Sequence, residues 1–171
     1  SQLKEKYPDL AFGISCASED VLPQILSEAG RFPGIKDSLC AIPKNYTYEL
    51  MRDSSCAIAK SGTVTLELAL HGSPTVVFYK LSWLNRLYAK YFLKLDLPYY
   101  GIVNILAGKE LFPELIEHGL SAKNLALQAE RLLTDGAARR ACIQGCKEIR
   151  DALGTGRASS HAAKAIMEVI S

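Results

Sequence analysis

Residues 56–72 read CAIAKSGTVTLELALHG and contain the side chains best suited to bind a ligand. Ser-Gly-Thr at residues 61–63 separates two apolar runs, and a glycine lets the chain turn tightly and lets a ligand approach the backbone. A helix starting there would place N–H groups without internal partners at the positive end of its dipole. That combination favours a phosphate or a diphosphate. The alternative is an ordinary strand-to-helix turn in which Ser61 or Thr63 caps the helix.

Glu67 is the second candidate binding residue, because it follows Thr63 by four positions. On a helix this spacing puts both side chains on one face, with Glu67 about 6 Å further along the axis. A diphosphate at the start of the helix would leave a ribose within reach of the carboxylate, a contact typical of dinucleotide sites. Glu67 is also the only Asp, Glu, Lys or Arg between Lys60 and Lys80, and a carboxylate in apolar surroundings needs a partner. The alternative is a solvated surface glutamate.

The elements that would position these residues alternate between strand and helix. Apolar runs predict strands at residues 10–15, 39–42, 56–59 and 74–79, and helices at 20–29, 46–52, 63–71 and 82–95. Residues 104–108 are expected to form a loop and 111–118 a short helix, followed by helices at 121–134, 137–153 and 157–170. Such alternation predicts an α/β fold with a parallel sheet covered on both faces. Ligands bind at the carboxyl ends of such strands, where residues 61–63 lie.

Composition limits the classes of function. The 171 residues are 49% apolar and 22% charged, as in a soluble globular domain, and no apolar run approaches the ~20 residues of a membrane span. The net charge of +2 gives no general signature of nucleic-acid binding. Five cysteines without C-x-x-C spacing indicate reduced thiols in a cytosolic protein, although Cys142 and Cys146, one helical turn apart, could share a metal. The opening residues look like the end of a helix, which indicates a fragment of a longer chain.

Residues 82–95 combine aromatic and basic side chains. One helical stripe would carry Trp83, Leu84, Leu87, Tyr88, Tyr91, Phe92 and Leu95, and Arg86, Lys90 and Lys94 would form a separate basic row. A helix of this kind can lie on an anionic membrane or hold acyl chains. The alternative is a helix that faces the core and has a solvated basic side.

Two blocks carry a resemblance to a known family. SGTVTLELALHGSPTVVFYK, followed by NILAGKELFPELIEH, resembles the C-terminal half of lipid-A-disaccharide synthase, a bacterial glycosyltransferase. The resemblance extends from YPDL near the start to the helical tail. It departs from the family pattern at Lys60, where a small residue is common, and at Val103, where proline is usual.

The resemblance implies one half of an inverting GT-B enzyme, with a Rossmann-like, doubly wound parallel sheet at residues 1–120 and a helical tail at 121–171. The whole enzyme would transfer 2,3-diacylglucosamine from UDP-2,3-diacylglucosamine to 2,3-diacylglucosamine 1-phosphate, with no metal or other cofactor. By match, Ser61, Gly62 and Thr63 would line the diphosphate, Glu67 would bind the ribose, and Asn104 would face the donor. The catalytic base would lie in the missing N-terminal half, and the fragment alone would be inactive. The enzyme would sit on the cytoplasmic face of the inner membrane.

Two alternatives remain from the sequence. The chain could belong to another UDP-sugar transferase or epimerase of the same fold, or to a non-catalytic subunit that binds a nucleotide sugar. Association into a homodimer also stays open.

Overall fold

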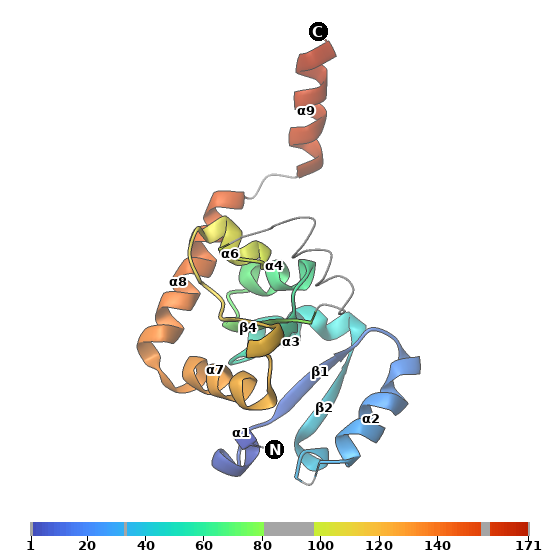
Figure 1. The fold of residues 1–171 in the computed structure, drawn as a ribbon. Helices are drawn as coiled ribbons and strands as arrows, with labels where there is room; N and C mark the ends of the chain where they lie inside the picture. Colours follow the sequence, from blue (N-terminus) through green and yellow to red (C-terminus); the bar gives the residue numbers. More distant parts are fainter. Residues whose placement is uncertain (1, 33, 81–97, 155–157, 171) are drawn as a thin grey trace.

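The computed structural model describes residues 2–32, 34–80, 98–154 and 158–170 (Figure 1). The strands are β1 (Phe12–Cys16), β2 (Leu39–Pro43), β3 (Ala57–Lys60), β4 (Thr75–Tyr79) and β5 (Glu114–Ile116). The α-helices are α1 (Gln2–Lys6), α2 (Leu22–Gly30), α3 (Thr47–Asp53), α4 (Thr63–Leu70), α6 (Ile102–Ala107), α7 (Ala122–Thr134), α8 (Gly136–Leu153) and α9 (Ala158–Ile170). Short 3₁₀ turns span Glu19–Val21, Lys36–Ser38, Lys44–Tyr46 and Glu117–Gly119.

The fold is α/β and Rossmann-like, and every strand pairing described is parallel. β1 pairs with β2, with Phe12 opposite Leu39. β4 lies between β3 and β5, with Thr75 opposite Ala57 and Val77 opposite Glu114. The strands therefore form two separate parallel sheets instead of the single sheet expected from the alternation.

The predicted elements agree with the structure over most of the chain, with boundaries that shift by one or two residues. The predicted secondary structure was wrong in two segments. Residues 104–108 were expected to form a loop, but α6 covers most of them and ends at Gly108, whose φ of 63° is left-handed. The glycine therefore marks the end of a helix, which is a common role for this residue.

The second wrong prediction concerns residues 111–118. Residues Glu114–Ile116 form strand β5, and a 3₁₀ turn follows. The edge of β4 accepts this segment, since Val77 N donates to Pro113 O at 2.8 Å. Sheet pairing thus overrides a local sequence that favours helix.

The main core surrounds β4. Val76 and Phe112 are fully buried, and the cluster also contains Ala69 of α4 together with Ala129 and Leu132 of α7. Figure 1 shows α4 and α6 on one side of β4 and α7 on the other. The long helix α8 packs against α4, α6 and α7, and it adds Cys142, Cys146 and Ile149 to the same core. Helices of the tail thus close the core of the β4 sheet. The proposed boundary at residue 120 stays a prediction.

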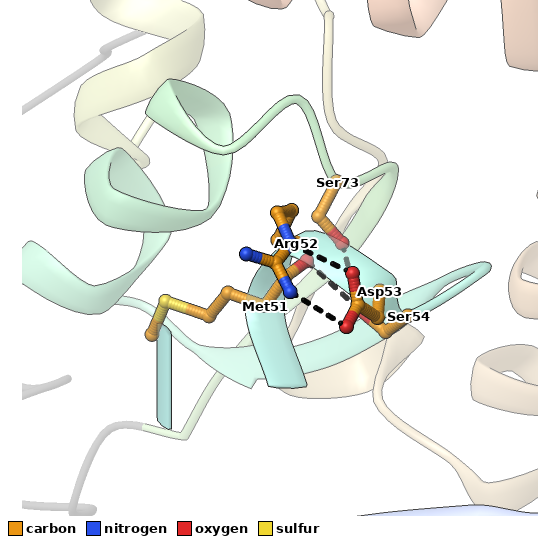
Figure 2. A network of polar contacts seen from close by, with 5 residues as sticks. All are labelled: Met51, Arg52, Asp53, Ser54 and Ser73. Carbon is orange, nitrogen blue, oxygen red and sulfur yellow. Dashed lines mark hydrogen bonds and ion pairs between the residues drawn. The ribbon is translucent and has the colours of Figure 1, made fainter. Parts of the chain in front are cut away.

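A polar network joins α3 to the turn before β4 (Figure 2). The Ser54 hydroxyl lies 3.0 Å from the Ser73 hydroxyl and donates to Met51 O at 3.2 Å. Beside it, the Arg52 guanidinium donates two hydrogen bonds to Asp53, at 2.8 and 3.0 Å. These hydrogen bonds from Arg52 lower the pKa of the Asp53 carboxyl. The network fixes the end of α3 next to the start of β4.

Two predictions from the sequence concern membranes: a basic, aromatic helix at residues 82–95 and the lack of a membrane-spanning segment. The helix expected at residues 82–95 lies outside the described residues. Among the helices that are described, none combines the length and the apolar character needed to cross a bilayer.

Candidate functional site

The turn at residues 61–63 lies at the end of β3, as the sequence predicted. Ser61 N donates to Phe78 O at 2.8 Å, which extends the pairing with β4 by one residue beyond Lys60. Gly62 is the N-cap of α4. Its carbonyl oxygen accepts from both Thr65 N and the Thr65 hydroxyl, at 3.1 and 2.7 Å. The buried Thr65 side chain therefore holds the turn from inside the molecule.

The start of α4 carries no side-chain cap. Neither Ser61 nor Thr63 caps the helix, so the ordinary capping role considered for them was wrong. Thr65 N pairs with Gly62 O, and no side-chain cap supplies a partner for the N–H groups that precede it in the helix. Gly62 and Thr63 are exposed, and Ser61 is half-buried. The start of α4 is thus exposed and lacks a side-chain cap.

Gly62 is not required by the backbone or by packing. Its φ of 161° and ψ of −169° describe an extended conformation that other residues also adopt. A Cβ atom added at this position would meet no atom within 4 Å. The space beside the start of α4 is therefore open, and a side chain at residue 62 could fill it without disturbing the fold.

Glu67 lies on α4, one helical turn after Thr63 and half-buried. Its backbone oxygen accepts from His71 N at 3.0 Å. Within the described residues its carboxylate forms no hydrogen bond or ion pair.

Asn104 lies in the interior, with an exposed fraction of 1%. Its amide nitrogen donates to Phe112 O and to Glu114 Oε1, both at 2.7 Å. Its oxygen accepts from Leu111 N and Phe112 N, both at 2.8 Å. These four bonds use both donors and both acceptor positions of the amide. The sequence predicted that Asn104 would face the sugar donor. In the structure, every hydrogen-bonding group of this side chain is already paired within the chain.

Glu114 connects Asn104 to the start of α6. Its carboxylate also accepts from Tyr100 N at 2.9 Å and from Gly101 N at 2.8 Å, at the start of α6. A Cβ atom on Gly101 would lie 2.7 Å from Glu114 Oε1, so this approach needs a glycine. Glu114, Tyr100, Gly101 and Ser61 line one small hollow.

The role of Glu114 was missed from the sequence. Its residue type and its place after Pro113 were visible, but the segment was predicted to be helical, which hid its position as the first residue of strand β5. The structure brings Ser61 and Glu114 together, and it places Asn104 behind Glu114.

The thiols form no metal centre in the described part of the chain, where no three Cys, His, Asp or Glu side chains gather to hold an ion. Cys142 and Cys146 are buried in the core, and none of the five cysteines is in a disulfide. Burial raises the pKa of Cys56 to about 12, and the nearby Cys142 adds to this effect. Cys56 is consequently neutral at physiological pH.

Comparisons with known proteins agree on one family. The family model described as lipid-A-disaccharide synthetase matches residues 1–169. A lipid-A-disaccharide synthase of Geobacter sulfurreducens is 34% identical over 173 residues, covering 99% of this chain and 42% of the relative. The enzyme of the same name from Anaeromyxobacter dehalogenans strain 2CP-C is 41% identical over 124 residues, covering 72% of this chain and 32% of the relative. The chain thus spans well under half the length of these curated relatives.

Proposed function

Since the chain belongs to the lipid-A-disaccharide synthase family, we propose that it is the half of this glycosyltransferase that binds the UDP-sugar donor. The complete enzyme would have two Rossmann-like domains in a GT-B arrangement. It would transfer 2,3-diacylglucosamine from UDP-2,3-diacylglucosamine to 2,3-diacylglucosamine 1-phosphate, with inversion at the anomeric carbon and release of UDP. The general base would belong to the other half, so this chain alone would bind the donor without turning it over.

The uncapped start of α4 is the observation that carries the proposal. Ser61, Gly62 and Thr63 would bind the diphosphate through backbone N–H groups and hydroxyls, at the positive end of the helix dipole. The open space above Gly62 lets the diphosphate approach the backbone. Glu67, one turn further along, would accept hydrogen bonds from the two ribose hydroxyls.

Asn104 would serve the donor site through its neighbours. It holds Glu114 and the segment Leu111–Phe112 in place, and Glu114 in turn holds the start of α6. Glu114 and Gly101 line the same small hollow as Ser61. Asn104 is therefore a positioning residue in this proposal.

Nucleotide binding by this chain tests the site. Titration calorimetry should show binding of UDP in preference to ADP and GDP. Gly62→Val should abolish binding and leave the fold intact, because the added side chain enters open space. Gly30→Val is the matched control, since its Cβ also meets nothing within 4 Å but lies on α2. Undiminished UDP affinity in a folded Gly62→Val variant would refute the assignment.

Glu67 can be tested by the ligand as well as by the variant. Losing a hydrogen-bonded charge costs about 1.5–3 kcal/mol, so Glu67→Gln should weaken UDP roughly 10- to 100-fold. The same change should hardly affect 2′,3′-dideoxy-UDP, which lacks both hydroxyls. Equal losses for the two ligands would show that Glu67 does not contact the ribose.

We also propose that the enzyme is peripheral at the cytoplasmic face of the inner membrane, with an acylated acceptor drawn from that surface. The support is the sequence of residues 82–95, where Arg86, Lys90 and Lys94 accompany the aromatic stripe. Each basic residue near an anionic surface contributes about 1 kcal/mol. Replacing all three with glutamine in the complete enzyme should reduce its association with anionic vesicles, and added salt should mimic the change. Unchanged association would favour a core-facing role for this segment.

A further inference from the structure

The small hollow beside Ser61 lies where the strands of the β4 sheet end. Ser61 follows β3 directly, and the last residues of β4 and β5, Tyr79 and Ile116, line the same hollow. Glu114 is the first residue of β5, but that strand has only three residues and starts opposite Val77, the third residue of β4. Glu114 is therefore close to the carboxyl ends of the strands, where ligands bind in parallel sheets of this kind.

The Glu114 carboxylate holds the chain segment that enters α6. Its Oε2 atom accepts from Tyr100 N at 2.9 Å, and its Oε1 atom accepts from Gly101 N at 2.8 Å. The Asn104 amide nitrogen donates to Oε1 as well, at 2.7 Å. Gly101 is buried, so its N–H group needs a partner inside the molecule. A carboxylate suits three converging donors, because an ionised carboxylate is purely an acceptor.

The contact between Glu114 and Gly101 depends on both residue types. The φ of Gly101 is −81°, which any residue adopts, so the backbone conformation does not require a glycine there. The close approach of the carboxylate does require it, since a Cβ atom would lie 2.7 Å from Glu114 Oε1. Residues 101 and 114 thus form a matched pair, and a change at either one disturbs the same contact.

The position of the hollow relative to α4 indicates which part of the donor would meet it. In the proposed function the diphosphate binds at residues 61–63, and the ribose binds at Glu67, one turn further along α4. Ser61 precedes the first residue of that helix, so the hollow borders the turn on the side of the strands, whereas Glu67 borders it along the helix. The sugar, which is attached to the second phosphate, would extend away from the ribose towards the hollow.

We propose that Glu114 is a positioning residue for the transferred sugar and acts through Tyr100 and Gly101. The proposal rests on the proposed function, because it needs the UDP-sugar at residues 61–63. The carboxylate fixes the backbone of residues 100–101, and the sugar packs against that segment, which holds the anomeric carbon in place for the acceptor. A misplacement of about 1 Å at a reacting centre can slow a reaction about 100-fold.

Kinetics of the complete enzyme with UDP-2,3-diacylglucosamine test this role. Glu114→Gln replaces one acceptor oxygen with an amide donor, which would face Tyr100 N or Gly101 N. Gly101→Ala keeps the charge but displaces the carboxylate. Each variant should lower kcat about 10- to 100-fold and change the Kd for UDP less than about twofold, because the proposed contacts of UDP lie at the turn and along α4.

Glu110→Gln and Gly119→Ala are the matched controls. Glu110 is an exposed glutamate of the same part of the chain. A Cβ atom on Gly119 would meet no atom within 4 Å. Both control variants should keep the kcat and the UDP affinity of the parent enzyme.

The outcomes separate this proposal from the proposed function. A fall in kcat with retained UDP affinity, in both Glu114→Gln and Gly101→Ala, would support the positioning role. Equal losses of kcat and UDP affinity would assign Glu114 to the stability of the fold, and unchanged kinetics would show that residues 100–101 do not meet the sugar. Either of these results would overturn the proposal while the parent still binds UDP. A parent enzyme that does not bind UDP would overturn the proposed function and this proposal together.

Discussion

The β4 sheet and the β1–β2 pair are built from similar strands but are packed very differently. In the β4 sheet, Val76 and Phe112 are fully buried, and helices cover both sides of β4. In the β1–β2 pair, Cys16 is the only strand residue that is buried, and the three residues before it are exposed. Figure 1 shows β1, β2 and α2 on one side of the molecule, away from α6 and α8.

The difference follows from the number of neighbours that a strand has. Within the described residues, β4 has a strand on each edge, whereas β1 pairs only with β2 and borders a cleft of about 900 Å³ on its other edge. A region with few buried apolar contacts opens at a lower free-energy cost than a core strand does. We therefore expect the β1–β2 pair to be the first part of this chain to open, and β4 to unfold with the whole domain.

The largest expected effect comes from removing a core side chain beside β4. Phe112→Ala should reduce the free energy of unfolding by about 3–5 kcal/mol, because a fully buried aromatic ring leaves a cavity. The matched change on the other side, Ile14→Ala, should cost about 1 kcal/mol or less, since that side chain is 39% exposed. Denaturant unfolding measures both. Similar losses for the two variants would contradict the contrast between the two regions.

An intermediate effect is expected from Asn104→Ala. The substitution leaves Leu111 N, Phe112 N and Phe112 O without partners in the interior, so the free energy of unfolding should fall by about 2–3 kcal/mol. Asn124→Ala is the control. Asn124 is half-buried and its side chain donates one bond, to Gly119 O at 2.8 Å, so its loss should cost about 1 kcal/mol. A loss for Asn104→Ala no larger than that of the control would show that the loop is held by other contacts.

The smallest effect concerns the contact between α7 and the residues just before β1, which links the two regions. Glu130 of α7 pairs with Lys6, and it accepts from the Tyr7 hydroxyl at 2.7 Å, just before β1. Hydrogen bonds from Lys6 and then Tyr7 lower the pKa of Glu130 in the folded chain. Its stabilisation is therefore present above the ordinary glutamate pKa of about 4.3 and is lost as the pH falls through the lower folded value.

Glu130→Gln should thus speed amide exchange near Tyr7 slightly at neutral pH, with little change in global stability, because exposed ion pairs contribute little. The stabilities of the variant and the parent should converge as the pH is lowered below about 4. Glu148→Gln breaks the pair with Lys109 on the well-packed side, and it should leave exchange near Tyr7 unchanged. A difference between the Glu130 variant and the parent that persists in acid would assign the effect to packing.

The alternation of apolar strands and helices was sufficient to predict much of the fold. β3, α4 and β4 form within one or two residues of their predicted ranges, because local hydrophobic patterns and the residues 61–63 specify them. The same reasoning placed Ser61, Gly62, Thr63 and Glu67 at the end of a strand and along the first turns of a helix. These relations are local, and spacing along one helix settles them.

Contacts distant in sequence decided the rest. β5 is a strand because the edge of β4 accepts it, although residues 111–118 alone favour helix. The uncapped start of α4 and the open space at Gly62 depend on how the turn is held from inside by Thr65. Asn104 is turned inward because Leu111 N and Phe112 N need acceptors in the interior. Residue types and periods along the chain thus determined which elements form, whereas pairing partners and buried polar groups, which only the tertiary structure supplies, decided what each side chain faces.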